Sequence, residues 1–126
     1  MFEINFNPFG DTQIDPNRAF DSSQKTFVIT HGFQNTGGNS SNGFQPEAWI
    51  QSKAAALRAI EPSANIIIVD WQEGAAPEGD VLSLLQYSTA ATNTAELGQT
   101  IAARLIELGA DPTTTELIGH SLGGRW

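Results

Sequence analysis

Four consecutive β-branched residues, Ile66–Val69, constrain the fold of this chain more than any other stretch. A continuous apolar run of strand length is typical of a central strand in a parallel sheet that is covered on both faces. Two further segments, Thr26–Thr30 and Thr115–Ile118, also have the composition of strands. The sequence therefore predicts a sheet with three core strands.

The segments between these runs predict two helices. The first has Pro46 in its first turn and ends at Glu61-Pro62, with these side chains at helical spacing: Trp49, Lys53, Ala56, Leu57 and Ile60. The second runs from about Ser88 to Leu108 and is closed by Gly109 and Asp111-Pro112, with these apolar positions on one face: Leu97, Ile101, Leu105 and Leu108. Crossovers of this length require the core strands to pair in parallel.

The N-terminal region predicts one more strand. Phe2, Ile4 and Phe6 alternate with polar residues up to Pro8, a pattern that indicates a strand pairing at an edge of the sheet. The polar segment 11–24 is expected to form a connection with one short helical turn. Together these patterns predict an α/β fold with a parallel-sheet core and crossover helices.

Composition excludes several classes of function. A net charge of −8, with only six Lys and Arg, argues against a nucleic-acid partner. The chain has no cysteine, which removes disulfides, thiolate zinc sites and cysteine nucleophiles. The aspartates of segment 11–24 lack the order of a calcium loop, so neither a metal nor a cofactor is expected. Asn39-Ser40-Ser41 fits a glycosylation sequon, although an ordinary polar loop is the favoured interpretation.

Two features of the sequence bear on localisation. No apolar run approaches the roughly 20 residues of a membrane span, so we expect no transmembrane segment. Met1-Phe2-Glu3 opens without the basic and apolar regions of a signal peptide. The compartment therefore stays unknown at this stage.

The segment Gly119–Gly123 matches the nucleophile-elbow pattern G-x-S-x-G. A serine at the apex of a strand-to-helix turn has a strained backbone, and glycines two residues away on either side avoid collisions there. Such a turn exposes the Ser121 hydroxyl and directs the first N–H groups of the next helix at a developing oxyanion. Because the pattern is short, it counts only together with the strand before it; the alternative is a glycine-rich turn without chemistry.

A serine nucleophile needs a base, and the chain has two histidines. His120 adjoins Ser121, so their side chains diverge from the turn. His31, Asp70 and Ser121 occur in the chain order of the chymotrypsin triad, at the ends of three predicted strands. Parallel sheets with an elbow, however, place the acid and the histidine after the serine. We therefore expect His31 to be a structural hydrogen-bonding residue.

Four motifs together resemble the lipases of the α/β-hydrolase fold, a family that includes pancreatic lipase and bacterial relatives. They occur in the family's order and cover residues 25–124: T-H-G-F at 30–33, V-D-W at 69–71, Y-x-x-A-x-x-N at 87–93 and I-G-H-S-L-G-G at 118–124. The combination is far more specific than the elbow pattern alone.

The resemblance implies a set of roles and a substrate. Ser121 would be the nucleophile, and the backbone N–H groups of Leu122 and Phe33 would form the oxyanion hole, in agreement with the general rule for such elbows. The substrate would be a lipid or another carboxylic ester, and the family leans towards an extracellular location. Asp70 and Trp71 would shape the sheet end and share in the pocket rim. Three residues would lie near one face of the long helix, where both packing and contact with the substrate stay open: Tyr87, Ala90 and Asn93.

The chain also departs from the family. Only residues 122–126 follow Ser121, so the family's catalytic acid and histidine are lacking. In addition, Arg125-Trp126 stands where the family has small residues at the start of the helix behind the elbow. We therefore expect residues 1–126 to be the N-terminal part of one α/β-hydrolase domain, truncated after the elbow and inactive or weakly active. An apolar sheet edge left exposed in this way favours self-association. The alternatives are a non-catalytic scaffold or interaction fragment and a thioesterase on the same fold.

Overall fold

The computed structural model describes residues 4–31, 38, 46, 48–71 and 83–119, without the side chains of 83–94. These residues form four strands and two α-helices, with a short 3₁₀ helix before the last strand. In chain order they are β1 (Asn5–Pro8), β2 (Thr26–Thr30), α1 (Ala48–Ile60), β3 (Asn65–Asp70), α3 (Ser83–Leu108), η2 (Pro112–Thr114) and β4 (Thr115–Ile118).

The strands form one mixed sheet in the order β1-β3-β2-β4. β2 pairs in parallel with β3 on one side and with β4 on the other. β1 pairs antiparallel to β3, so it occupies an edge. The prediction of a parallel core with an additional N-terminal edge strand is therefore confirmed.

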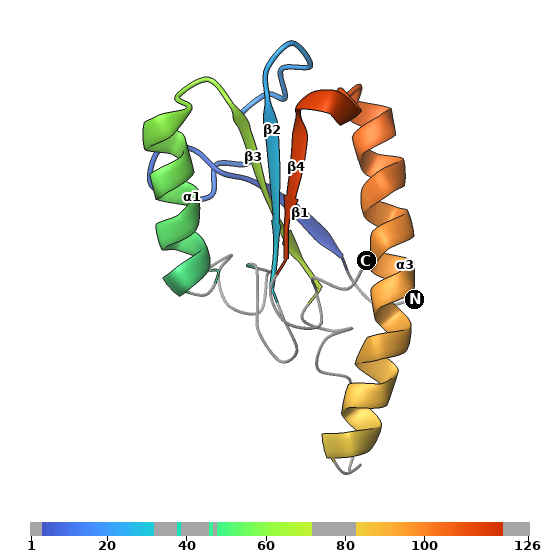
Figure 1. Cartoon of the computed structure of the whole chain (residues 1–126). Coiled ribbons are helices and arrows are strands. Elements are labelled where there is room, and N and C mark those ends of the chain that lie inside the picture. The colour runs from blue at the N-terminus through green and yellow to red at the C-terminus, as the bar shows by residue number, and fades with distance from the viewer. Residues whose placement is uncertain (1–3, 32–37, 39–45, 47, 72–82, 120–126) are drawn as a thin grey trace.

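The sheet lies between two helical layers, with α1 over one face and α3 over the other (Figure 1). Successive side chains of a strand point to opposite faces, and the core follows that alternation. On the α1 face lie Phe27, Ile29, Ile66 and Ile68, packed with Ile50 and Ala54. On the α3 face lie Val28, Ile67, Val69 and Trp71, packed with Leu97 and Ile101. Burial on both faces is why the inner positions of β2 and β3 are all apolar, with polar residues only at the strand ends.

The buried face of α1 differs from the predicted one. Its buried residues are Ile50, Ala54 and Arg58, whereas Trp49 is 37% and Ile60 73% exposed. The predicted buried face was wrong because it was chosen to include the large apolar residues Trp49 and Ile60. In the structure, the face that packs on the sheet includes an arginine instead. Arg58 is 6% exposed and binds backbone carbonyls there.

The long helix α3 begins at Ser83, five residues before the predicted start, and ends at Leu108 as expected. Its Leu97 and Ile101 are buried, which confirms the predicted stripe. Gly109 has a positive φ of 81°, and two bonds close the helix: Gly109 N–H to Ile106 O and Ala110 N–H to Leu105 O. This pair of bonds is a Schellman cap, which needs a left-handed residue.

The turn after α3 is held by Asp111, which caps η2. Its Oδ1 accepts bonds from the N–H of Thr113 at 2.9 Å and from the Thr113 hydroxyl at 2.8 Å. These bonds, the backbone one first, lower the pKa of Asp111 below its ordinary value. The 3₁₀ helix was not predicted, although Asp111-Pro112 was identified as a stop signal.

The N-terminal region also differs in detail from the prediction. β1 continues through Pro8, and Phe9 then forms an isolated bridge to Ile14. Segment 11–24 contains turns and no helical turn. It is tied down by Asn65, whose side chain accepts from Asp21 N–H at 2.8 Å and donates to Asp21 O at 2.7 Å. The segment is therefore held in place by hydrogen bonds from one asparagine side chain to its backbone, and not by the backbone hydrogen bonds of a helical turn.

Candidate active site

The parallel strands end together at one edge of the sheet. We call this the carboxyl edge; it is formed by the last residues of β2, β3 and β4, namely Thr30, Asp70 and Ile118. Thr30 is opposite Val69, and Ile29 is opposite Ile118. The last residues of the three parallel strands therefore lie at the same edge of the sheet (Figure 1). This edge is where a parallel sheet places its ligand crevice.

The connections that leave β2 and β3 at this edge lead to opposite faces. β2 is followed by α1, which covers one face, and β3 by α3, which covers the other. In such sheets the ligand crevice lies where the strand order reverses, which here is between β2 and β4. His31 and Trp71, which directly follow β2 and β3 at the carboxyl edge, are both fully buried.

His31 and Trp71 are joined by two hydrogen bonds. The backbone N–H of Trp71 donates to His31 Nε2 at 2.8 Å, and the indole N–H of Trp71 donates to the His31 carbonyl at 2.9 Å. The two rings are stacked, with centroids 5.5 Å apart and planes 20° from parallel. The end of β2 is thus locked to the end of β3 by both backbone and side-chain atoms.

This bonding determines the tautomer of the neutral His31 ring. An N–H that donates to Nε2 requires a lone pair there, so the neutral ring carries its proton on Nδ1. In a serine relay, Nε2 takes the serine proton while a carboxylate accepts from Nδ1. Here Nε2 is held by Trp71, and Asp70 Oδ1 lies 3.7 Å from that same nitrogen, beyond hydrogen-bond length. The pair is therefore not arranged as the acid and base of a triad.

The carboxylate of Asp70 has another role at this edge. It is 1% exposed, and its Oδ2 accepts a bond of 3.3 Å from the side chain of Asn5 on β1. Neighbouring Asn7, also buried, donates from its amide to the carbonyl of Gly38 at 2.7 Å. Gly38 has a φ of 99°, a conformation that favours glycine. The alternation in the sequence predicts one buried apolar face for β1 and gives no signal that the two asparagines of the other face form these bonds.

Several predicted site residues lie outside the described part of the chain. Ser121, Leu122 and Phe33 are among them, and so is the sequon at Asn39. Tyr87, Ala90 and Asn93 lie within α3, where only the backbone is described. Within the described ranges, no group of three or more potential ligands could hold a metal ion. Among those same residues, no helix has the length and hydropathy needed to cross a bilayer.

Comparison with known proteins adds the decisive observation. The family model described as Lipase matches residues 9–125. This chain belongs to the lipase family. The match includes the segments after β2 and β4 that carry the candidate residues of the carboxyl edge.

Individual relatives of this lipase-family chain are similar along most of its length. It is 33% identical over 120 residues to lipoprotein lipase of Sus scrofa, which covers 92% of the chain and 22% of the relative. It is 33% identical over 111 residues to lipoprotein lipase of Homo sapiens, covering 84% and 20%. It is 32% identical over 110 residues to inactive pancreatic lipase-related protein 1 of Canis lupus familiaris, also covering 84% and 20%. The chain thus spans about a fifth of the length of these relatives.

Proposed function

We propose that this chain carries the nucleophile and the oxyanion hole of a serine hydrolase that cleaves lipid or other carboxylic esters. The observation that supports it most is the parallel pairing of β4 with β2, because it brings the carboxyl ends of both strands to one edge. Family membership supports the same class of reaction. In this proposal, residues 1–126 are the N-terminal part of one α/β-hydrolase domain.

Covalent geometry limits how far the proposed groups are from that edge. Phe33 follows the described His31 by two residues, and Ser121 follows the described Gly119 by two. Consecutive Cα atoms are 3.8 Å apart, so the Cα atom of Phe33 is within about 7.6 Å of that of His31, and the Cα atom of Ser121 is within the same distance of that of Gly119. His31 is anchored to Trp71 through its own carbonyl, immediately before the segment that leads to Phe33. An oxyanion donor benefits from such a fixed starting point, since preorganisation is what makes it effective.

The proposed chemistry is acyl transfer. The Ser121 hydroxyl attacks the ester carbonyl, the N–H groups of Phe33 and Leu122 stabilise the oxyanion, and the alcohol leaves with a proton. His31 is excluded as the base by its bond from Trp71, and His120 adjoins the nucleophile. We therefore propose that the base and its acid lie outside these 126 residues. A free base of the same chemistry can then substitute for the missing histidine.

Imidazole rescue of p-nitrophenyl butyrate hydrolysis tests the proposal. We expect added imidazole to raise the rate of the chain at least tenfold more than that of Ser121→Ala, because only the chain has a hydroxyl to activate. Mass spectrometry should then detect a butyryl group on Ser121. The alanine variant also serves as the control for direct catalysis by imidazole. Equal increases in hydrolysis rate for both proteins, with no butyryl adduct, would favour the alternative of a non-catalytic scaffold. One of the relatives has a name that describes it as inactive.

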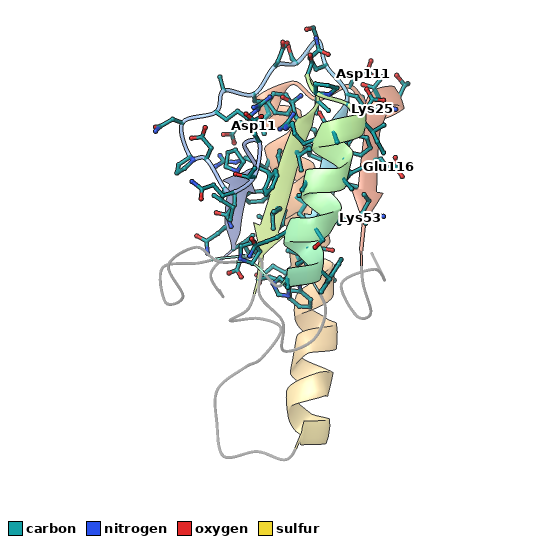
Figure 2. The ribbon with its side chains drawn as sticks, turned by 90° about the vertical axis from the view of Figure 1, so that its left-hand side faces the viewer. Asp11, Lys25, Lys53, Asp111 and Glu116 are labelled. Atoms are coloured by element: carbon teal, nitrogen blue, oxygen red, sulfur yellow. The ribbon has the colours of Figure 1, made fainter. Side chains whose placement is uncertain are left out.

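We also propose that the chain self-associates through β4. Within the described sheet, β4 pairs on one side only, with β2. Glu116 lies on the α1 face (Figure 2), whereas Leu117 lies on the α3 face and is 47% exposed. A strand with a free edge and an exposed apolar side chain is a template for pairing with another chain.

Leu117→Lys is expected to reduce this association, because a charge on an edge strand opposes pairing. Sedimentation velocity across a range of protein concentrations should show dimers or larger species for the chain and a shift to monomer for the variant. Ile60→Lys is the matched control, since Ile60 is 73% exposed but lies at the end of α1. A monomeric parent chain at all concentrations would refute the proposal.

A further inference from the structure

A cavity of about 260 Å³ lies beside β1 and the first half of β3. It is bounded by β1, the first residues of β3, the segment 18–20 and the last turns of α3. Its lining reaches Phe6, which is opposite Val69, but it includes none of the residues at the carboxyl edge, namely Thr30, His31, Asp70, Trp71 and Ile118. The cavity is therefore separate from the proposed ester site.

Most of the cavity wall is apolar. Phe6, Phe20, Ile67 and Leu108 contribute to it, and all four belong to the core cluster on the α3 face or pack against it. Only one lining residue is polar and uncharged, namely Asn65. A wall of this kind favours an alkyl chain, at about 25 cal/mol for each Å² of apolar surface removed from water.

Both charged residues of the lining are arginines, Arg18 and Arg104. This is notable in a chain with 14 acidic and six basic residues, because the cavity wall itself contains no Asp or Glu. The Arg104 guanidinium lies 5.3 Å from the centre of the Phe6 ring, which holds it over the apolar wall. Two cations at one apolar cavity are complementary to a single amphiphilic anion.

The acids near these arginines are more exposed than the arginines are. Arg104 bonds to Glu107 at 3.1 Å, with side chains 45% and 71% exposed. Arg18 lies 3.9 Å from Asp11, with side chains 32% and 87% exposed. Exposed pairs of this kind contribute little and are screened by salt. A guanidinium has five N–H donors, so each arginine can still offer a forked pair to a carboxylate.

We infer that this cavity binds an alkyl carboxylate of medium chain length, with the chain against Phe6, Phe20 and Leu108 and the head group between Arg18 and Arg104. The planar fork of guanidinium matches a carboxylate. The volume corresponds to roughly nine water-sized groups, close to the size of octanoate. The site is independent of ester hydrolysis; if the proposed function holds, its ligand belongs to the same class as the acid product.

Titration of the 126-residue chain with octanoate, followed by NMR, tests this inference. We expect saturable binding with Kd of about 1 mM or below, in line with the affinity of small ligands, and shifts at Ile66, Ile67 and Leu108. Octan-1-ol, which lacks the charge, should bind at least fivefold more weakly, and acetate, which lacks the chain, should not saturate. Equal binding of the alcohol, or shifts confined to His31 and Trp71, would overturn the inference.

Matched variants distinguish a specific effect of the two arginines on octanoate affinity from an effect of the chain's net charge. Arg18→Gln and Arg104→Gln should each weaken octanoate binding about fivefold. Lys53→Gln removes the same charge from α1, on the opposite face of the sheet (Figure 2), and should leave Kd within twofold. Ala19→Glu adds an acid at an exposed lining position without disturbing the core, and should also weaken binding. Identical affinities in all four variants would refute the site.

Binding is also to be measured in Ser121→Ala. This variant should bind octanoate as the parent chain does, because Ser121 lies beyond the opposite end of β4. Failure of imidazole rescue would therefore leave the cavity inference untouched, and failure of octanoate binding would leave the hydrolase proposal untouched.

Discussion

Arg58→Met is expected to lower the free energy of unfolding by about 3–5 kcal/mol. Arg58 is buried on α1, and its guanidinium donates to four backbone carbonyls: Phe9 at 2.8 Å, Gly10 at 2.9 Å, Pro62 at 3.0 Å and Ala64 at 2.6 Å. Methionine fills a similar volume but leaves these acceptors without their donor. Each buried carbonyl left in that state costs about 1–3 kcal/mol.

The position of these carbonyls explains why one side chain matters so much. They belong to the turn after β1 and to the connection between α1 and β3, so Arg58 joins α1 and the connection that follows it to a turn that lies 48 and 49 positions earlier in the sequence. Burial lowers the pKa of the Arg58 guanidinium, which shows that desolvation opposes its charge. The carbonyl dipoles offset that cost. Arg58→Lys should lose part of the stability, since an ammonium has three donors and no planar fork.

Urea denaturation followed by circular dichroism measures these differences. Lys53→Met, on the exposed side of the same helix, is the control and should change stability by no more than about 0.5 kcal/mol. If the parent chain is less stable than the expected loss, Arg58→Met should be unfolded without denaturant. A loss below about 1 kcal/mol would mean that water replaces the guanidinium at these carbonyls.

Trp71→Ala is expected to cost about 3–5 kcal/mol, the range for a large aromatic residue removed from a core. Trp71 is fully buried, packs with the α3-face cluster and stacks on His31. Trp71→Phe keeps most of the apolar volume and the backbone N–H bond to Nε2, but removes the indole donor to the His31 carbonyl. That variant should cost about 1–3 kcal/mol.

The comparison of the two Trp71 variants isolates the hydrogen bond from the packing. Equilibrium unfolding gives the stability of each variant. In Trp71→Phe, the increase in hydrogen-exchange rate over the parent chain should be larger at the carboxyl edge than at residues 50–58 of α1. Ile60→Ala, at a position 73% exposed, is the control and should be nearly neutral. Equal stabilities of Trp71→Phe and the parent would contradict the lock between β2 and β3.

The accuracy of the fold prediction from sequence differs from one strand or helix to the next. Ile66–Val69 allowed one interpretation, and β3 contains all four residues. Thr26–Thr30 and Thr115–Ile118 were predicted to the residue, because short β-branched runs ended by polar or glycine residues have few alternatives. α1 was predicted in place but rotated, since two stripes of similar periodicity compete when an arginine is on the buried face.

The candidate site, too, was predicted only in part from the sequence. Its motifs predicted which segments meet at the carboxyl edge, and the parallel register of β2, β3 and β4 agrees with that. Ser121, Phe33 and Leu122 stay predictions. The bond that excludes His31 as a base could not be predicted, because it depends on the 2.8 Å approach of a backbone N–H forty residues away.

The sequence was sufficient to decide where strands and helices form, because β-branching and periodicity act over a few residues at a time. It also decided in which direction the core strands pair, because the length of each connection can be counted along the chain. Which polar groups are buried, and what they bind, was decided only when distant segments met. Arg58, His31 and Asn7 each satisfy, or are satisfied by, backbone atoms at least thirty positions away. A buried polar group must find a partner, and only the assembled fold determines which one is within reach.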